Sequence, residues 1–171
     1  MSTPSDVLVL SQRILQELIL LGASREEIGK RRNSSDIYNE MITNKLLRNK
    51  TQKMFMDGHH ASAVEEAYKL LDNIVKRKAG MNNTAYTGAA LMQKVFTPNK
   101  PILKLNAGVT TSEIDEQNGY MQILAGCMIG VRNPRAHESD WEDTEERALQ
   151  LIIFANHLIE RAQHAEVSDV R

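Results

Sequence analysis

Cysteine is almost missing from this sequence of 171 residues, in which Cys127 stands alone. An intrachain disulfide and a C-x-x-C pair for zinc or redox chemistry are therefore excluded. No stretch approaches the roughly 18 consecutive apolar residues that a membrane-spanning helix needs. The first residues, MSTPSDVLVL, lack the basic segment and cleavage site of a secretory signal. These absences predict a protein of the reducing cytoplasm that does not enter a membrane.

Glycine and proline are also scarce, with 9 and 4 residues, and the formal net charge is only −1. Hydrophobic residues make up 42% of the chain and charged residues 25%. This is the composition of a folded globular protein, and it excludes a disordered chain.

The small net charge hides an asymmetry. Residues 1–104 contain 16 Lys and Arg against 10 Asp and Glu, a net +6, and residues 105–171 contain 5 against 12, a net −7. Such polarity predicts either two parts that attract each other or a surface with one basic side. The sequence pI of about 6.5 argues against a general nucleic-acid binder held mainly by phosphate contacts.

Apolar residues recur at intervals of three and four, whereas the alternation typical of strands is nearly absent. We therefore predict an all-α fold, with an N-terminal helical region at residues 1–56, a helical bundle at 57–166 and a disordered tail at 167–171. In the N-terminal region Ser24 and Glu27 are expected to form a capping box. The helices expected there span residues 4–22, 25–32 and 34–54.

The helical bundle contains the clearest amphipathic pattern, which follows Gly58 and ends at Gly80. Ser112 and Asp115 are expected to open a later long helix. The helices expected in this part span residues 59–80, 88–96, 112–132 and 143–165. The positions expected to face the core are Val64, Ala67, Leu71, Ile74 and Val75; then Leu91, Met92, Val95 and Phe96; then Ile114, Met121, Leu124, Met128 and Val131; and finally Leu149, Ile152, Ile153, Ala155, Asn156 and Leu158.

Three glycines, Gly119, Gly126 and Gly130, fall inside the helix expected over residues 112–132. Each weakens a helix by about 1 kcal/mol relative to alanine. We therefore expect another helix to approach closely, either within the bundle or across a two-fold axis. The sequence leaves both alternatives open.

The segment RNPRAH at residues 132–137 is the most informative part of the chain. A residue before proline is pushed away from helical geometry, so we expect the long helix to end near Arg132. Asn133 is then expected to cap a short helical piece that begins at Pro134. Arg132 and His137 would project from this junction toward a common point. A guanidinium matches two phosphate oxygens and an imidazole exchanges protons at neutral pH. The pair therefore indicates phosphodiester chemistry that needs no metal or other cofactor.

RNPRAH resembles the R-x4-H motif of the HEPN superfamily of all-helical domains. The segments DGHHASAVEEAYKLLDNIVKRKAG, LMQKVF and NGYMQILAGCMIGVRNPRAH and the final helix are similar, in that order, to its conserved-hypothetical Ymh-type branch. The resemblance covers about Asp57 to Ala165. Glu138 and Ser139 follow the motif His where toxins paired with a nucleotidyltransferase antitoxin tend to carry a Tyr, so that subtype is not expected.

The resemblance implies a four- or five-helix bundle that forms a homodimer, in which two R-x4-H motifs face each other across a cleft. Active members are metal-independent endoribonucleases of phage defence, toxin–antitoxin pairs or RNA processing, so RNA and an antitoxin or other regulator are the implied partners. By the same resemblance Arg132 binds phosphate, Asn133 is the polar residue after the motif Arg, and His137 is the general acid or base. Arg135 is an auxiliary phosphate contact. A ribose 2′-hydroxyl would attack the adjacent phosphate, leaving a 2′,3′-cyclic phosphate and a 5′-hydroxyl.

Two other functions remain open at this point. The same cleft could serve a non-catalytic module that binds RNA, a nucleotide or a protein. A DNA-binding regulator would draw on the basic cluster at residues 30–32, but that segment has no helix-turn-helix pattern. The acidic run at 138–146 should repel a phosphate backbone, so RNA would have to be held by Arg132, Arg135 and basic clusters at 30–32, 45–53 and 76–78.

Other polar and aromatic residues are interpreted as structural. Asp57, His59 and His60 are expected to cap a helix or lie exposed rather than bind a metal, because adjacent histidines on a helix point in different directions. His157 and His164 are expected to be hydrogen-bonded within the fold. Trp141 is expected to pack in the core or in an interface.

Overall fold

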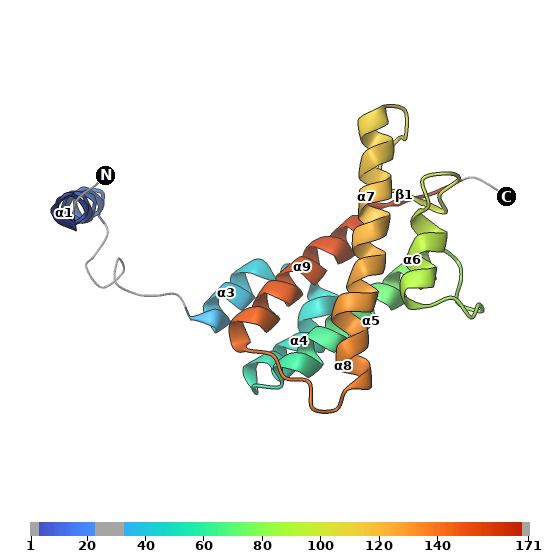
Figure 1. Ribbon diagram of the computed structural model, residues 1–171, viewed down its shortest axis with the longest axis horizontal. Coiled ribbons are helices and arrows are strands. Elements are labelled where there is room, and N and C mark those ends of the chain that lie inside the picture. Colours follow the sequence, from blue (N-terminus) through green and yellow to red (C-terminus); the bar gives the residue numbers. More distant parts are fainter. Residues whose placement is uncertain (1–3, 23–32, 169–171) are drawn as a thin grey trace. The chain divides into compact units, whose positions relative to one another are not determined.

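A computed structural model describes residues 4–22 and 33–168 of the chain (Figure 1). Helices make up most of the described residues, which confirms the expected all-α fold. The chain divides into two compact units, Met1–Asn33 and Ser34–Arg171. The first unit contains helix α1 (Pro4–Leu20), as the sequence predicted. The helix expected over residues 25–32 lies outside the described residues.

The second unit contains the remaining described elements. In chain order they are α3 (Ser34–Met41), α4 (Lys45–Met56), α5 (His60–Lys78), α6 (Gly88–Phe96), β1 (Leu103–Lys104), α7 (Thr111–Cys127), the π-helical turn η1 (Met128–Arg132), α8 (Asn133–His137), α9 (Glu145–His164) and β2 (Glu166–Val167). None of the described helices combines the length and the apolar character needed to cross a bilayer.

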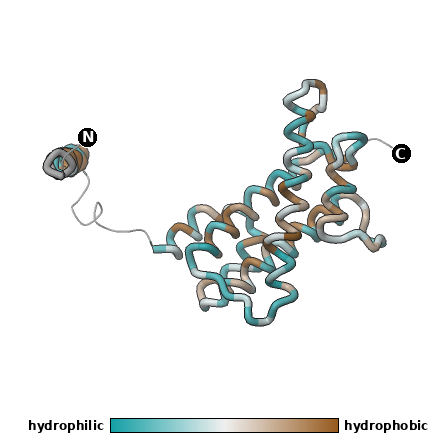
Figure 2. Tube along the Cα trace, viewed as in Figure 1, coloured by the Kyte–Doolittle hydropathy of each residue, from teal (hydrophilic) through white to brown (hydrophobic). Residues whose placement is uncertain are grey.

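Helix α5 is the central helix of this unit and contacts α4, α6, α8, η1 and α9. All of its positions that were expected to face inward, from Val64 to Val75, are buried. The apolar positions of α6 and most of those of α9 are buried as well, and the hydropathy trace shows how the apolar residues line these helices (Figure 2). Burial of these stripes is the main force that holds the bundle together.

The single helix expected over residues 34–54 is wrong, because the chain breaks between α3 and α4. At the break, the backbone N–H of Asn44 donates to Oδ1 of Asn156 (3.0 Å), and the Asn44 side chain accepts from the first N–H groups of α4. The guanidinium of Arg48 donates to the carbonyl of Ile42, the residue after α3 (Nε to O, 3.1 Å). The polar backbone groups exposed by the break are thus satisfied by side chains.

Residues 34–56 were expected in the N-terminal region, but they belong to the same compact unit as the later helices. Tyr38, Leu47 and Phe55 are buried in the shared core, where α3 and α4 contact α9 and α4 contacts α5. The boundary between units therefore falls before Ser34, because these apolar side chains need the later helices to cover them.

The last described residues, up to Ser168, are also held by the fold. Strands β1 and β2 pair antiparallel, with Leu103 opposite Val167. The backbone N–H of Ser168 donates to the carbonyl of Ile102 (2.9 Å). Val167 and Ser168, which were expected in a disordered tail, are therefore ordered by backbone hydrogen bonds, and residues 169–171 lie outside the described residues.

Helix α7 begins one residue earlier than expected, at Thr111. Its N-cap is Thr110, which forms a capping box with Glu113. Ile114, expected to face the core, is 45% exposed. The inward position is taken instead by Gln117, whose amide accepts from the N–H of Leu105 (2.9 Å) and donates to the carbonyls of Phe96 (2.9 Å) and Leu103 (3.1 Å). A polar side chain thus fixes the loop between α6 and α7, and a purely apolar pattern cannot reveal it.

Candidate functional site

The RNPRAH motif lies on a continuous helical segment that runs from α7 through η1 into α8. The π turn η1 ends at Arg132 and the short helix α8 begins at Asn133 with Pro134 in its first turn, which confirms the expected boundary and the expected short helical piece. The expected extended N-cap at Asn133 is wrong, since its φ of −63° and ψ of −43° are helical and the backbone continues without a break. Its N–H donates to the carbonyl of Met128, five residues back, which is the hydrogen bond of a π turn. A wider turn removes the carbonyl clash that a proline causes in a regular α-helix, so Pro134 does not break the segment.

Arg132 is half-buried at the end of η1 and lines a surface cavity of about 210 Å³. Its Nη1 donates one hydrogen bond to Oδ1 of Asn133 (3.1 Å). The other residues that line the cavity are Lys69, Asp72, Asn73, Thr87, Gly88 and Met128. The guanidinium of the motif therefore borders a space large enough for a small polar group.

Asp72 connects the helices that form the cavity. Its carboxylate accepts from the N–H of Gly88 (2.6 Å) and from the hydroxyl of Thr87 (2.9 Å), which joins α5 to the first turn of α6. Lys69 contributes the second cation, and its hydrogen bonds to Glu65 (2.9 Å) and Glu66 (3.0 Å) raise its pKa. The cavity is thus a fixed polar surface with two positive charges and three nearby carboxylates.

His137 ends α8, and its imidazole is exposed. Among the described residues its side chain makes no hydrogen bond. Because residues five apart on a helix are rotated by about 140°, Arg132 and His137 of one chain project from different sides of the same segment. The expected convergence of the two side chains within one chain is therefore not what this backbone produces.

Arg135 lies between these two residues in the sequence, and its side chain forms a buried ion pair instead of facing solvent. Its Nε and Nη2 donate to the two carboxylate oxygens of Asp143 (2.6 and 2.7 Å), and its Nη1 donates to the carbonyl of Val131 (2.6 Å). Both charged side chains are almost completely buried, at 1% and 0% exposed. A bidentate buried pair of this kind fixes the loop after α8, and it leaves Arg135 no free donor face for a phosphate.

Trp141 covers this ion pair from the loop. The guanidinium carbons of Arg135 and Arg147 lie 5.5 and 5.9 Å from the centre of its ring. The indole is half-buried, and its Nε1 is buried with no hydrogen-bond partner among the described residues. The expected packing role for Trp141 agrees with these contacts.

Among the described residues of the second unit, nothing covers one face of α7 and η1. Ile123 and Ile129 are 41% and 58% exposed there, and Gly126 and Gly130 lie beside them. No other described atom is within 4 Å of the place where a Cβ would stand on either glycine, and the same is true of Gly119. The alternative in which a helix of the same bundle packs closely on these glycines is therefore wrong, and packing across a two-fold axis stays a prediction.

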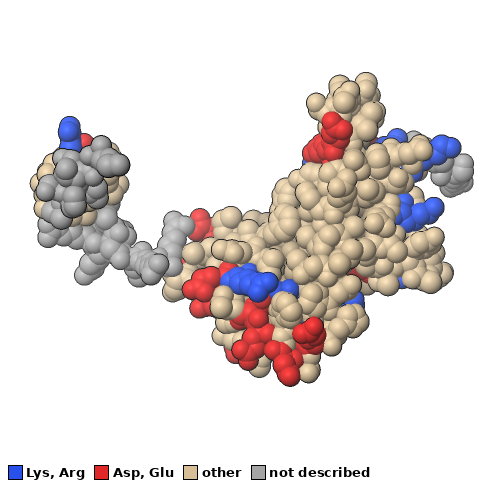
Figure 3. Space-filling view, in the orientation of Figure 1, with Lys and Arg blue, Asp and Glu red and all other residues tan. Residues whose placement is uncertain are grey.

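Acidic residues surround the exposed end of the motif. Glu138, Asp140 and Glu142 are all exposed in the loop that follows α8, and Figure 3 shows the acidic side chains gathered at that end of the bundle. The basic cluster at residues 30–32 lies outside the described residues. The surface next to His137 is thus negative, as the sequence indicated.

The other histidines occupy separate positions. His157 Nε2 and the Tyr120 hydroxyl are 2.7 Å apart, and His164 Nδ1 lies 2.7 Å from the carbonyl of Glu160, so both are hydrogen-bonded within the fold. His59 and His60 line an open cavity of about 390 Å³ together with Trp141 and Glu142. Within the described residues no group of three or more His, Cys, Asp and Glu side chains is placed to hold a metal ion.

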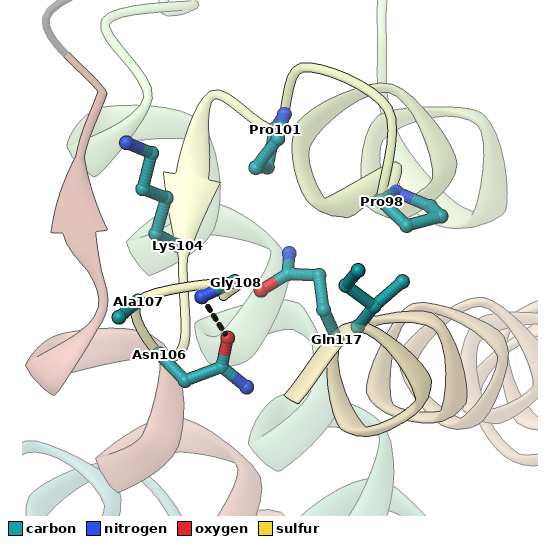
Figure 4. A pocket seen from close by; sticks show the side chains of 8 residues that line it. Pro98, Pro101, Lys104, Asn106, Ala107, Gly108 and Gln117 are labelled. Atoms are coloured by element: carbon teal, nitrogen blue, oxygen red, sulfur yellow. Dashed lines mark hydrogen bonds between the residues drawn. The ribbon is translucent and has the colours of Figure 1, made fainter. Parts of the chain in front are cut away.

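A further cavity of about 210 Å³ lies beside the first turns of α7 (Figure 4). Pro98, Pro101, Lys104 and Gln117 line it, and the loop that closes it is fixed by a hydrogen bond from the N–H of Gly108 to Asn106 (3.1 Å). Gln117 and Arg132 are 15 residues apart on one continuous helical segment, a separation of about 22 Å. This cavity is therefore separate from the motif.

Sequence reasoning singled out Arg132, Asn133 and His137 as candidates but did not point to the residues that line the cavity beside Arg132. Lys69 and Asn73 fall on the polar side of an amphipathic helix, where charged residues are usual, and Thr87 falls in a loop. Asp72 gave no signal either, because it lies 16 residues before the N–H group of Gly88 that it binds, and that separation is too long for a local pattern.

A family model described as "Protein of unknown function (Hypoth_ymh)" matches residues 43–162. The matched region begins just before α4 and includes the motif and nearly all of α9. No match was found among curated proteins. No match was found among solved structures.

Proposed function

The chain belongs to the Hypoth_ymh family of proteins of unknown function, and we propose that it is a HEPN-like, metal-independent endoribonuclease that works as a homodimer. In this proposal Arg132 binds the scissile phosphate, His137 transfers protons, and Asn133 orients the guanidinium of Arg132 through the hydrogen bond between them. The substrate is RNA, because the reaction uses a ribose 2′-hydroxyl.

The observation that carries the proposal is that the three side chains of Arg132, Arg135 and His137 differ in their exposure. Arg132 borders an open cavity and the imidazole of His137 is exposed, whereas Arg135 between them is buried in an ion pair with Asp143. If the motif served only folding, the buried pair of Arg135 and Asp143 would be needed. Folding would not require Arg132 beside an open cavity or an exposed His137. The open positions are those of R-x4-H.

The chemistry follows from the properties of the two open groups. An imidazole takes the proton of the 2′-hydroxyl, and the oxygen attacks the adjacent phosphorus. The guanidinium stabilises the negative charge that develops on the phosphoryl oxygens. The bond from phosphorus to the 5′-oxygen breaks, and an imidazolium donates a proton to that oxygen. The products are a 2′,3′-cyclic phosphate and a 5′-hydroxyl.

A second copy is needed because Arg132 and His137 of one chain project from different sides of the helical segment. The open face of α7 and η1 offers a surface for that copy, with exposed Ile123 and Ile129 and two glycines that permit close approach. In the dimer, Arg132 of one chain acts together with His137 of the partner subunit. Arg135 is left out of the substrate contacts.

The acidic loop next to His137 favours a second candidate function. Exposed Glu138, Asp140 and Glu142 repel an RNA backbone and attract a basic surface. The protein would then be a non-catalytic module that binds a partner through the same face. Phage defence, a toxin–antitoxin pair or RNA processing remain the settings in which either function would serve.

Cleavage of RNA by the full chain tests the proposal. Purified protein is incubated with cellular RNA and with excess chelator, and the new RNA ends are analysed chemically. We expect cyclic phosphate ends, and we expect them to disappear in H137A and R132A. H164A is the matched control, because His164 is also an exposed histidine near a helix end, and it should cleave normally. Cleavage that survives H137A contradicts the proposal, and binding of a protein partner without any cleavage supports the second candidate.

A further inference from the structure

Helix α1 has apolar side chains that nothing else in residues 4–22 covers. Leu10, Ile14 and Leu18 are 59%, 49% and 37% exposed. Most helical stability in proteins comes from packing an apolar face against another element rather than from the helix itself. The helix is therefore expected to form against a partner surface.

The order of these residues is symmetric about Ile14. Leu10 lies four residues before it and Leu18 four residues after it, so each is rotated by about 40° to either side of Ile14. The sequence continues the symmetry with an apolar residue seven positions away in both directions, at 7 and 21. A second α1 that runs antiparallel, with a two-fold axis at Ile14, places Ile14 against Ile14 and Leu10 against Leu18.

The charges of α1 favour the same arrangement. Leu10, Ile14 and Leu18 form the apolar stripe of α1, and Arg13 and Glu17 lie on one side of it. Arg13 Nε is 3.6 Å from Glu17 Oε1, and both side chains are exposed. In an antiparallel pair centred on Ile14, the two-fold axis keeps that side of both helices together. Glu17 of the second copy then lies about 3 Å along the axis from Arg13. A parallel pair puts these charged sides on opposite edges, so only the antiparallel pair gains opposite charges across the interface.

A lipid surface fits this helix less well. Helices that bind anionic membranes carry several lysines and arginines on the polar face. The sequence of α1, PSDVLVLSQRILQELIL, contains one basic residue, Arg13, against two acidic ones. Electrostatic attraction to an anionic bilayer is therefore missing, whereas self-pairing uses both charges beside the stripe.

We propose that α1 is a self-association helix, which pairs antiparallel with α1 of a second copy of this chain about a two-fold axis at Ile14. The pairing does not depend on the proposed ribonuclease activity, because no residue of the motif takes part. Through this pairing, the first unit of one copy contacts the first unit of another copy.

Cysteine cross-linking of the full chain tests the pairing. Chains that carry L10C and chains that carry L18C are co-expressed, one with a tag that separates the mixed dimer on a gel. The native thiol is a poor competitor, because Cys127 is buried and burial raises its pKa. We expect the mixed L10C–L18C disulfide to form several-fold faster on mild oxidation than a disulfide between two L10C chains or two L18C chains.

The control is Q16C, since Gln16 is exposed and lies about 200° around the helix from Ile14. Cross-links between two L10C chains that form as fast as the mixed disulfide would mean a parallel pair and overturn the arrangement. Mixed cross-links no faster than those of Q16C overturn self-pairing altogether. Protection of the introduced cysteines by neutral or anionic vesicles, without cross-linking, would assign the stripe to a membrane and overturn the proposal.

Discussion

Arg135 and Asp143 form a buried ion pair, with Arg135 Nε 2.6 Å from Asp143 Oδ2, inside the motif segment that also contains the open residues Arg132 and His137. Removing one partner of a buried pair leaves the other charge uncompensated, which typically costs about 3–5 kcal/mol. We expect R135A to lose that amount of unfolding free energy in urea denaturation. R147A is the control: Arg147 also approaches Asp143 (3.5 Å), but its side chain is 57% exposed, so we expect a loss below about 1 kcal/mol. Normal stability of R135A together with weaker RNA binding would restore Arg135 as a substrate contact.

Gln117 should matter for stability although it is far from the motif. It is buried, and its amide binds three backbone groups, the carbonyl of Phe96 at the end of α6 and two groups of the segment between α6 and α7. Q117L leaves those groups unsatisfied, and each unsatisfied buried polar group costs about 1–3 kcal/mol. We expect Q117L to lower the unfolding free energy by at least about 2 kcal/mol, and Q122L, at an exposed position of the same helix, to leave it unchanged. Equal stability of the two variants would contradict the contacts described for Gln117.

The capping box of α7 should make stability depend on pH. Hydrogen bonds from the backbone N–H groups of Thr110 and Val109 lower the pKa of Glu113. A carboxyl group whose pKa is lowered by folding stabilises the folded state above its unfolded pKa of about 4.3. That contribution is lost as the pH falls through the lower pKa of the folded state.

We therefore expect E113A to be less stable than the native chain at pH 7 and the difference to shrink as the pH falls below about 4. Unfolding free energies measured from about pH 7 to about pH 3 decide the matter. A difference for E113A that grows toward low pH would have the wrong sign for this capping box.

The exposed face of α7 that contains Ile123 predicts that the second units of two chains dimerise through it. In chains that carry I14R, which interrupts the α1 stripe, we expect the protein to remain a homodimer by light scattering. Adding I123R should convert it to a monomer, because a charge is placed in the apolar contact. M41R is the control, since Met41 is comparably exposed on α3, and it should leave the dimer intact. A monomer before I123R is added would contradict dimerisation through α7.

Local patterns in the sequence predicted the elements whose apolar stripe meets a neighbouring helix. Helix α5 was found almost to the residue, because its apolar positions from Val64 to Val75 repeat with helical spacing and all of them are buried. The division of α3 from α4 was missed, since the group that stabilises it, Asn156, lies 112 residues from Asn44 in the chain. Contacts of that sequence separation leave no local pattern.

The site was predictable to the same limited extent. Spacing singled out Arg132 and His137 as candidates. The rule that proline disrupts helices predicted the boundary at Arg132, but it did not predict the π turn η1, across which the backbone stays helical. Arg135 was expected to be an auxiliary phosphate contact because of the resemblance of RNPRAH to the R-x4-H motif. Its contact is with Asp143, eight residues later, and the loop that contains Trp141 brings Asp143 back to it.

Restoration of activity in mixed dimers is the most direct test of the central claim, which is that Arg132 of one chain works with His137 of the other. Chains with R132A and chains with H137A are each expected to be inactive. Co-expressed and purified as mixed dimers, they contain one intact pair of Arg132 and His137, on different chains. We predict that these mixed dimers cleave RNA to cyclic phosphate ends at about half the native rate per dimer, since one of two sites is complete. Native chains that cleave RNA while the mixed dimers stay as inactive as either variant alone would contradict the account.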